Sequence, residues 1–484
     1  MNYSAPSTRD RRKLTPRQGL IIATIAISAV VLAPAAASGV RIAMALLALP
    51  LFLMVFVLFE RRPGLGIPAA VVVSLLVPFT IGTGTQSGLN ASILWIGFLL
   101  GIWLLDMVTR DQSIRLVDSP VIVPLMGLMV ASVLAFALGQ LNWLPIPTAS
   151  FIAQAGGLAL FLLLPGAFLL TVHQLGRIRN LEWMVWLFLG LGGLFVVGLL
   201  IGSTRKYALT YFQRAVFDSL FWTWIITLSF SQILLNGNLS KGSRILLGGI
   251  CASAFYFTVV IRQSWTSGWL PGAVSIGVIL LMIKPKWVLA GGALGLLAIL
   301  LIPGVFDQIF LTGDNPYSLE TRVAALRIMG NIIKFNPILG LGPANYYAYT
   351  PLYRILGYSV NFNSHNNYVD IVAQIGVVGL GFFLWFAGAL AKEFWSVRMR
   401  MPPGFQRAYM YGAIGGLAGT MLSGLLGDWI IPFVYNIGLE GFRASSLAWM
   451  FLGGALALRL ALPAEPSDDL SNAMTFEGGP IRSW

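Results

Sequence analysis

Apolar runs of about 17 residues or more recur along the whole chain, and this feature limits the possible folds more than any other. A helix of that length crosses the roughly 30 Å hydrocarbon layer of a bilayer. Hydrophobic residues make up 57% of the 484 residues and charged residues only 10%, unlike the composition of a soluble domain. The sequence therefore predicts an all-α polytopic integral membrane protein with about 12–14 transmembrane helices.

The orientation of the predicted spans follows from the charged segments between them. Five basic residues within the first 18 precede the first apolar run, so the positive-inside rule places this tail in the cytoplasm. Most of the 31 Lys and Arg residues then fall on the cytoplasmic side, as does the C-terminus. The spans are expected at about 19–37, 42–59, 65–82, 91–109, 119–138, 150–172, 181–201, 215–235, 244–261, 268–283, 287–303, 368–391, 407–427 and 444–461.

These spans divide the chain into five predicted segments. They are a cytoplasmic basic tail (1–18), an N-terminal transmembrane bundle (19–303), a large extracytoplasmic loop with short helices (304–367), C-terminal transmembrane helices (368–461) and a disordered cytoplasmic tail (462–484). A loop as long as 304–367 is usually functional or internally folded. It is the first place to look for a site.

Charge and cysteine content exclude several classes of function. The net charge of +13 is explained by the orientation of the spans and by contact with anionic membrane lipids, and no nucleic-acid-binding module is present in the sequence. The single cysteine, Cys251, allows no intramolecular disulfide. With two histidines and no cysteine cluster, the sequence predicts no metal site and no cofactor.

Basic residues on the predicted outer side need another explanation, because insertion does not require them there. Arg214 and Arg262 each lie at the edge of a predicted span. Either one could be a membrane-interface anchor or could bind an anion in a cavity. The outer basic residues are Arg41, Arg205, Lys206, Arg214, Arg262, Arg322, Arg327, Lys334, Arg354 and Arg443.

The large loop carries its own helix and turn signals. Small or apolar residues at helical spacing predict a helix over 319–335, with Arg322 and Arg327 flanking its apolar face. Pro337 ends this helix, and the glycines at 340 and 342 predict a compact turn. The tyrosines over 346–358 are interpreted either as an interfacial belt or as a surface for stacking on sugar rings.

The segment 361–379 places His365 where the polar loop meets an apolar run. Asn363 or Ser364 is expected to cap the helix that follows, whose first turn offers free N–H groups and a partial positive charge. An imidazole there would lie beside an anion site. The alternative is a polar helix cap with a histidine that has no role.

Two motifs in this region resemble those of a known family. His365-Asn366, nine further residues and then Gly376-Val377-Val378-Gly379 resemble the His-(Asn/Ser/Gln)-x9-Gly-x-x-Gly motif of bacterial O-antigen ligases and polymerases. Arg322, followed by the Asn-Pro-x-x-Gly-x-Gly segment that contains Pro337, Gly340 and Gly342, resembles a second motif of that family. The family's Ser-Arg-x-x-Trp-like segment has only a displaced counterpart here, at Arg262.

The resemblance implies a GT-C-like membrane glycosyltransferase. Such an enzyme transfers a glycan from undecaprenyl pyrophosphate to an acceptor hydroxyl, at the outer face of the bacterial cytoplasmic membrane and without a metal. It implies that Arg322, Arg214 and Arg262 bind the donor pyrophosphate, since arginine meets phosphate in a bidentate fork. It also implies that Asn366, Gly376, Gly379, Gly340, Gly342 and Pro337 are structural motif residues.

Arg322 and His365 are the predicted catalytic pair. His365 would either accept the proton of the attacking hydroxyl or donate a hydrogen bond to phosphate. The acceptor is a lipid A-core for a ligase and a growing glycan for a polymerase, and the motifs leave both open. A transporter or lipid-linked sugar flippase and a non-catalytic scaffold are the alternatives. A transporter would show paired repeats and midplane charges, which the sequence lacks.

Overall fold

The computed structural model describes residues 62–462, apart from 83–87, 110–111, 114, 142, 144, 263–264 and 302–315. Within these residues the regular structure is almost entirely helical, and the one sheet is the hairpin of β1 (Thr80–Gly82) and β2 (Gly88–Asn90). Seven of the described helical segments are long and apolar enough to cross a membrane. The prediction of an all-α polytopic membrane protein is therefore confirmed.

The longer helices account for the predicted spans. They are α3 (Gly66–Leu76), α4 (Ala91–Thr109), α5 (Ile122–Leu138), α6 (Phe151–Gln174), α7 (Ile178–Leu200), α9 (Ser219–Leu235), α10 (Lys241–Phe255), α11 (Thr266–Ile283), α12 (Pro285–Leu301), α15 (Asn367–Val397), α16 (Phe405–Leu426) and α17 (Phe442–Ala461). Each predicted span from 65–82 onward overlaps one of them. The predicted spans 19–37 and 42–59 lie outside the described residues.

Shorter helical elements connect these spans. They are η1 (Pro63–Leu65), α8 (Gly202–Tyr211), η2 (Arg214–Phe217), η3 (Tyr256–Ile261), α13 (Pro316–Ile333), α14 (Tyr346–Tyr349), η5 (Thr350–Leu352) and η6 (Leu439–Gly441). The sequence did not predict α8, and the span expected over 65–82 is wrong at its end, because α3 stops at Leu76 and the chain turns into β1. The helix expected over 319–335 is confirmed as α13, which begins three residues earlier.

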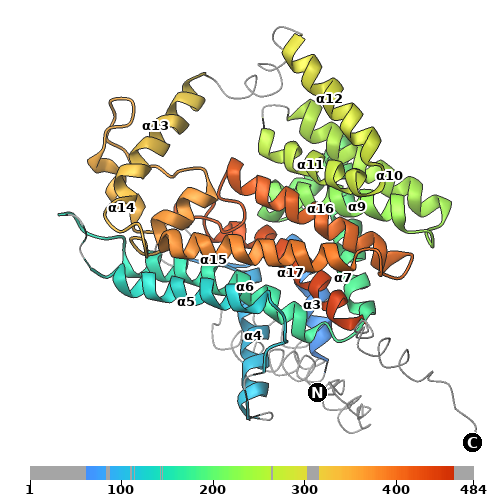
Figure 1. Cartoon of the computed structure of the whole chain (residues 1–484), viewed down its shortest axis with the longest axis horizontal. Coiled ribbons are helices and arrows are strands. Elements are labelled where there is room, and N and C mark those ends of the chain that lie inside the picture. The colour runs from blue at the N-terminus through green and yellow to red at the C-terminus, as the bar shows by residue number, and fades with distance from the viewer. Residues whose placement is uncertain are drawn as a thin grey trace, which may run out of the picture.

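Helices from both ends of the described chain form one core. In Figure 1, α5, α6, α15 and α17 cross the centre of the molecule, while α9 to α12 lie at one end and α13 and α14 at the other. The C-terminal helices pack between earlier ones, α16 against α9 and α11, α17 against α6, and α15 against α5. The C-terminal helices therefore do not form a bundle of their own.

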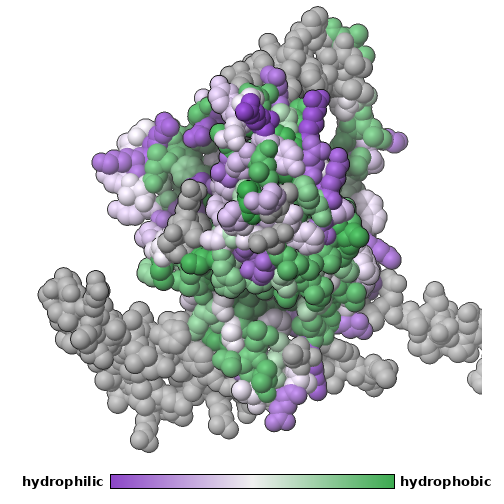
Figure 2. Space-filling view, turned by 90° about the vertical axis from the view of Figure 1, so that its left-hand side faces the viewer, coloured by the Kyte–Doolittle hydropathy of each residue, from purple (hydrophilic) through white to green (hydrophobic). Residues whose placement is uncertain are grey.

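A second, smaller core holds together the segment that was predicted as the large extracytoplasmic loop. Tyr346 and Tyr349 are buried there, and the Tyr346 ring stacks on Phe433 with centroids 4.6 Å apart. Met329 and Ile332 of α13 pack into the same cluster. Both interpretations of these two tyrosines were wrong, since neither ring is available to lipid or sugar. Viewed from the side of α13 and α14, hydrophilic side chains gather at the level of these helices and hydrophobic side chains form most of the surface below (Figure 2).

Candidate functional site

The two sequence motifs meet in space and form one structural unit. Helix α15 is interrupted at Ile375 (φ −131°, ψ 15°) and Gly376 (φ 71°, ψ −179°). The segment after Pro337 runs alongside this break and bonds to it through the backbone, with Leu341 N–H donating to Ala373 O (2.9 Å) and Val377 N–H donating to Pro337 O (2.8 Å). The Asn-Pro-x-x-Gly-x-Gly segment thus satisfies backbone groups that the break in the His-Asn-x9-Gly-x-x-Gly motif would leave unpaired.

Glycine is required at this junction for two reasons. Gly340, Gly342 and Gly376 have φ values of 74°, 96° and 71°, where other residues are strained. Their Cα atoms also lie against backbone, since a Cβ on Gly340 would collide with Gln374 and a Cβ on Gly376 would collide with the Ile338 carbonyl. At Gly379 a Cβ would collide with the side chain of Ile375. The glycine motifs therefore shape the chain that presents His365.

His365 lies immediately before α15 in a constrained turn. Its φ of 50° is in the left-handed region, which histidine adopts more often than most residues. On its C-terminal side the Asn366 side chain caps α15, accepting from Tyr368 N–H (3.0 Å) and Val369 N–H (3.3 Å). The expectation that Asn363 or Ser364 caps this helix was wrong. Ser364 instead donates to Asp370 Oδ1 (2.7 Å), which fixes the N-terminal side of the turn.

The loop after α16 brings a carboxyl group to this turn. Asn366 Nδ2 donates to Leu425 O (3.3 Å), and Asn367 Oδ1 accepts from Ile430 N–H (2.7 Å), so the start of α15 is joined to the end of α16 and the chain that follows it. Asp428 lies in that chain, where it accepts from Phe433 N–H and Asn436 Nδ2. Burial raises the pKa of Asp428, while these hydrogen bonds and the charge of His365 oppose the rise.

Two of the predicted pyrophosphate-binding arginines line one cavity. Arg262, at the end of η3, and Arg322, on α13, face a space of about 360 Å³. Trp222 also lines it, and the Trp222 indole N–H is buried without a hydrogen-bond partner. The other lining residues are Leu199, Phe217, Phe257, Trp265, Thr266, Ser267 and Leu426. We call this space the first cavity.

The third predicted arginine, Arg214, lines a second cavity of about 620 Å³. Phe217 is part of both linings, and Trp265 of the first cavity contacts Trp429 of the second edge-on, with centroids 6.3 Å apart. Thus the structure brings Arg262 and Arg322 together and places Arg214 in the adjoining space. The lining of neither cavity includes His365. His365 is connected to the first cavity through its neighbour Asn366. The Asn366 side chain donates a hydrogen bond to the carbonyl of Leu425, and the next residue, Leu426, lines that cavity.

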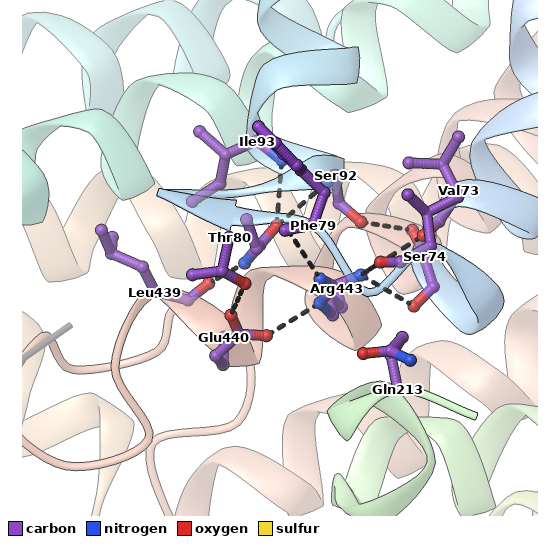
Figure 3. A network of polar contacts seen from close by, with 12 residues as sticks. Val73, Ser74, Phe79, Thr80, Ser92, Ile93, Gln213, Leu439, Glu440 and Arg443 are labelled. Carbon is purple, nitrogen blue, oxygen red and sulfur yellow. Dashed lines mark hydrogen bonds and ion pairs between the residues drawn. The ribbon is translucent and has the colours of Figure 1, made fainter. Parts of the chain in front are cut away.

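A fully buried arginine supports the wall of the second cavity (Figure 3). Arg443, in the first turn of α17, donates to Glu440 Oε2 (2.8 Å), Val77 O (3.0 Å) and Val73 O (3.3 Å). Val73 lies in the last turn of α3 and Val77 is its C-cap, and carbonyl groups at the C-terminal end of a helix favour a cation. Pro78, Gln213 and Gly441 around this network all line the second cavity.

Replacing Arg443 with methionine is expected to destabilise the protein by about 3 kcal/mol, because it leaves buried carbonyls and Glu440 without their donor. The measurement is the apparent melting temperature of detergent-purified protein. Arg459→Met, at the other end of α17, is the matched control. Its ion pair with Glu393 is partly exposed and is expected to contribute less than about 1 kcal/mol. Equal losses in the two variants would contradict this role for Arg443.

Asp218 is expected to make stability depend on pH. Burial raises the pKa of its carboxyl well above 3.8, with a further rise from Asp428 and a partial offset from the Leu220 N–H and Arg214. A raised folded-state pKa gives stability that is complete below about 3.8 and is lost as the pH rises through the folded pKa. Melting temperatures of wild type and Asp218→Asn should therefore diverge in favour of the variant as pH increases above 4. Parallel pH profiles would contradict this assignment.

The fold and the site define a polytopic membrane protein with two adjoining cavities lined by arginines. Residues 226–384 match the model of the O-antigen ligase family, which supports membership of the O-antigen ligase and polymerase family and confirms the resemblance seen in the motifs. A search of curated proteins found no match. This region of the chain is therefore similar to the O-antigen ligase family, whose members are ligase-type or glycosyltransferase-like enzymes of polysaccharide biosynthesis.

The matched region contains both motifs, Arg262, Arg322 and His365, whereas Arg214 and Asp428 lie outside it. Within the described residues, no group of three or more His, Cys, Asp or Glu side chains is arranged to hold a metal ion. The sequence did not predict the second cavity, and it indicated Asp428 only as a residue of the last predicted outer loop that could help to close a cavity.

Proposed function

We propose that this chain transfers a glycan from undecaprenyl pyrophosphate to an acceptor hydroxyl at the outer face of the bacterial cytoplasmic membrane, with both termini and the segments 1–18 and 462–484 in the cytoplasm. The observation that supports this most directly is the meeting in one cavity of Arg262 and Arg322, two arginines of the region that matches the O-antigen ligase family. Two guanidinium groups around one space suit a diphosphate better than any neutral ligand.

The proposed reaction is a displacement at the anomeric carbon of the donor sugar. The acceptor oxygen forms a bond to that carbon while the bond to the pyrophosphate oxygen breaks, and the charge on the departing pyrophosphate grows. Arg322 and Arg262 stabilise this charge. Arg214, in the adjoining cavity, adds positive potential beside them. No metal is needed in this scheme, because the arginines supply the electrostatic stabilisation.

The acceptor proton goes to His365 in this scheme. The imidazole is exposed at the start of α15, and Asp428 interacts with it electrostatically. A carboxylate beside an imidazole favours the imidazolium that forms on proton transfer. The alternative role, a hydrogen bond from His365 to phosphate, uses the same placement. The fixed turn between Ser364 and Asn366 suits either role, since both need a defined ring position.

Complementation of bacteria that lack either the O-antigen ligase or the O-antigen polymerase tests the proposal. Rescue of the ligase-null strain would place glycan on the lipid A-core, and rescue of the polymerase-null strain would restore the ladder of repeat lengths. We favour the ligase, whose motif the chain matches. Rescue of a flippase-null strain instead would contradict the proposal and identify a transporter.

His365→Asn should abolish the rescue, with a fall in transfer rate of at least about a hundredfold. Asparagine tolerates a positive φ, so this change removes the imidazole without adding backbone strain. Membrane levels of the variant, measured by immunoblot, should equal those of wild type. Full rescue by His365→Asn would remove His365 from the mechanism.

A further inference from the structure

Apart from the positive potential of Arg214, the second cavity has no task in the handling of pyrophosphate by Arg262 and Arg322, yet it is the larger of the two spaces. Its volume of about 620 Å³ is within the range of small-molecule sites, roughly 300–1,000 Å³. It adjoins the first cavity through the shared Phe217 and the contact between Trp265 and Trp429. A ligand held in the first cavity could therefore extend into the second.

Two buried polar atoms of the residues lining this cavity have no hydrogen-bond partner. Asp218 is 3% exposed, and its Oδ1 accepts from Leu220 N–H (3.0 Å) while its Oδ2 accepts nothing. The indole N–H of Trp429 is likewise buried and donates to nothing. Burying such a group without a partner destabilises a protein, so each one calls for an explanation.

The polar groups of this lining indicate which part of a lipid-linked glycan (the polyprenyl tail, the pyrophosphate or the sugar) the second cavity would bind. A polyprenyl tail carries no polar atom and would leave both groups unpaired. A pyrophosphate offers acceptors to Trp429 and Arg214, but it offers no donor to the Asp218 oxygen when this carboxyl is ionised. A sugar hydroxyl can both donate and accept. The remaining wall is mixed, with Thr210 and Gln213 as further polar partners and Phe212, Phe217 and Ile437 as apolar surface for the C–H faces of a ring.

We propose that the second cavity is a saccharide subsite, in which Asp218 accepts from and Trp429 donates to hydroxyls of the sugar bonded directly to the donor pyrophosphate. The inference rests on the proposed function. It commits to that sugar because only the ring attached to the pyrophosphate must lie next to the arginines of the first cavity. Asp218 and Trp429 then distinguish a glycan-bearing lipid from the bare carrier, which helps the product carrier to leave.

Binding of two lipids to the detergent-purified full chain tests the subsite. One lipid is undecaprenyl pyrophosphate, and the other is the lipid-linked glycan isolated from the strain that the wild-type chain rescues. Asp218→Asn replaces Oδ2 with a donor but keeps an effective helix N-cap for α9. Trp429→Phe keeps an aromatic ring and removes the five-membered ring that carries the indole N–H donor. Trp183→Phe, at an exposed site on α7, is the control for a lost indole.

We expect both variants to weaken binding of the lipid-linked glycan about tenfold and to leave binding of undecaprenyl pyrophosphate unchanged. The control should bind both lipids as wild type does. Equal weakening for both lipids would overturn the subsite and assign the cavity to the pyrophosphate. Unchanged binding of both lipids would also overturn the subsite, and it would indicate that buried water molecules are the partners of Asp218 and Trp429. A wild-type chain that rescues no transferase-null strain would reject the proposed function, and the subsite with it.

Discussion

Replacement of Arg322 with glutamine is expected to lower the rate of glycan transfer by about a thousandfold. An arginine that stabilises a departing phosphate group contributes factors of about 10³ or more, because the charge it meets grows in the transition state. Arg322 lines the first cavity with Arg262, and glutamine keeps a long polar side chain without the charge. The measurement is the initial rate at which purified protein releases undecaprenyl pyrophosphate.

Arg327→Gln is the matched control for this prediction. Arg327 lies five residues further along α13, is exposed and does not line the first cavity, so the same change should leave the rate within about twofold. A Michaelis constant that rises while the maximal rate is unchanged would show that Arg322 only binds the donor. Equal rates for wild type and Arg322→Gln would remove Arg322 from the site altogether.

A Gly376→Ala substitution is expected to cost the protein more than about 4 kcal/mol and to prevent recovery of folded chain. Gly376 has a φ of 71°, and an added Cβ would collide with the carbonyl of Ile338, a backbone atom that cannot turn aside. Moving the two segments apart to remove this collision would break the backbone hydrogen bonds from Val377 N–H to Pro337 O and from Val378 N–H to Ile338 O. Size-exclusion chromatography of detergent extracts would measure the recovery.

The control is Gly381→Ala, five residues further along the same helix, where a Cβ meets nothing within 4 Å. Alanine has the higher helix propensity, so this variant should be as stable as wild type or up to about 1 kcal/mol more stable. If both variants fold with the same melting temperature, the break in α15 does not depend on glycine. The joining of the two motifs would then need another explanation.

The helices could be predicted from the sequence because each depends on local properties. Span length and apolar content placed 91–109 and 150–172 within two residues of α4 and α6. α8 was missed because its Arg205 and Lys206 make it polar, and a helix that lies on a neighbour needs no apolar run of membrane length. The end of α3 was missed because an apolar stretch alone does not distinguish helix from strand.

The candidate site was only partly predictable, because it depends on contacts between residues that are far apart in the sequence. The motifs marked His365 and Arg322, but nothing local showed that the two glycine segments would bond to each other. The tyrosines at 346 and 349 were misinterpreted because their burial depends on Phe433, more than eighty residues away. The second cavity combines α8, η2 and the chain between α16 and α17, and such long-range contacts leave no periodic signal in a single sequence.

We propose that this chain cleaves the bond between a glycan and undecaprenyl pyrophosphate. The most direct measurement incubates the purified protein with radiolabelled lipid-linked glycan and acceptor, and follows both products. We expect undecaprenyl pyrophosphate and glycosylated acceptor to appear in equal amounts, and neither to appear with the Arg322→Gln variant. Donor that crosses a vesicle membrane with its glycan still attached, and no pyrophosphate release, would contradict the claim.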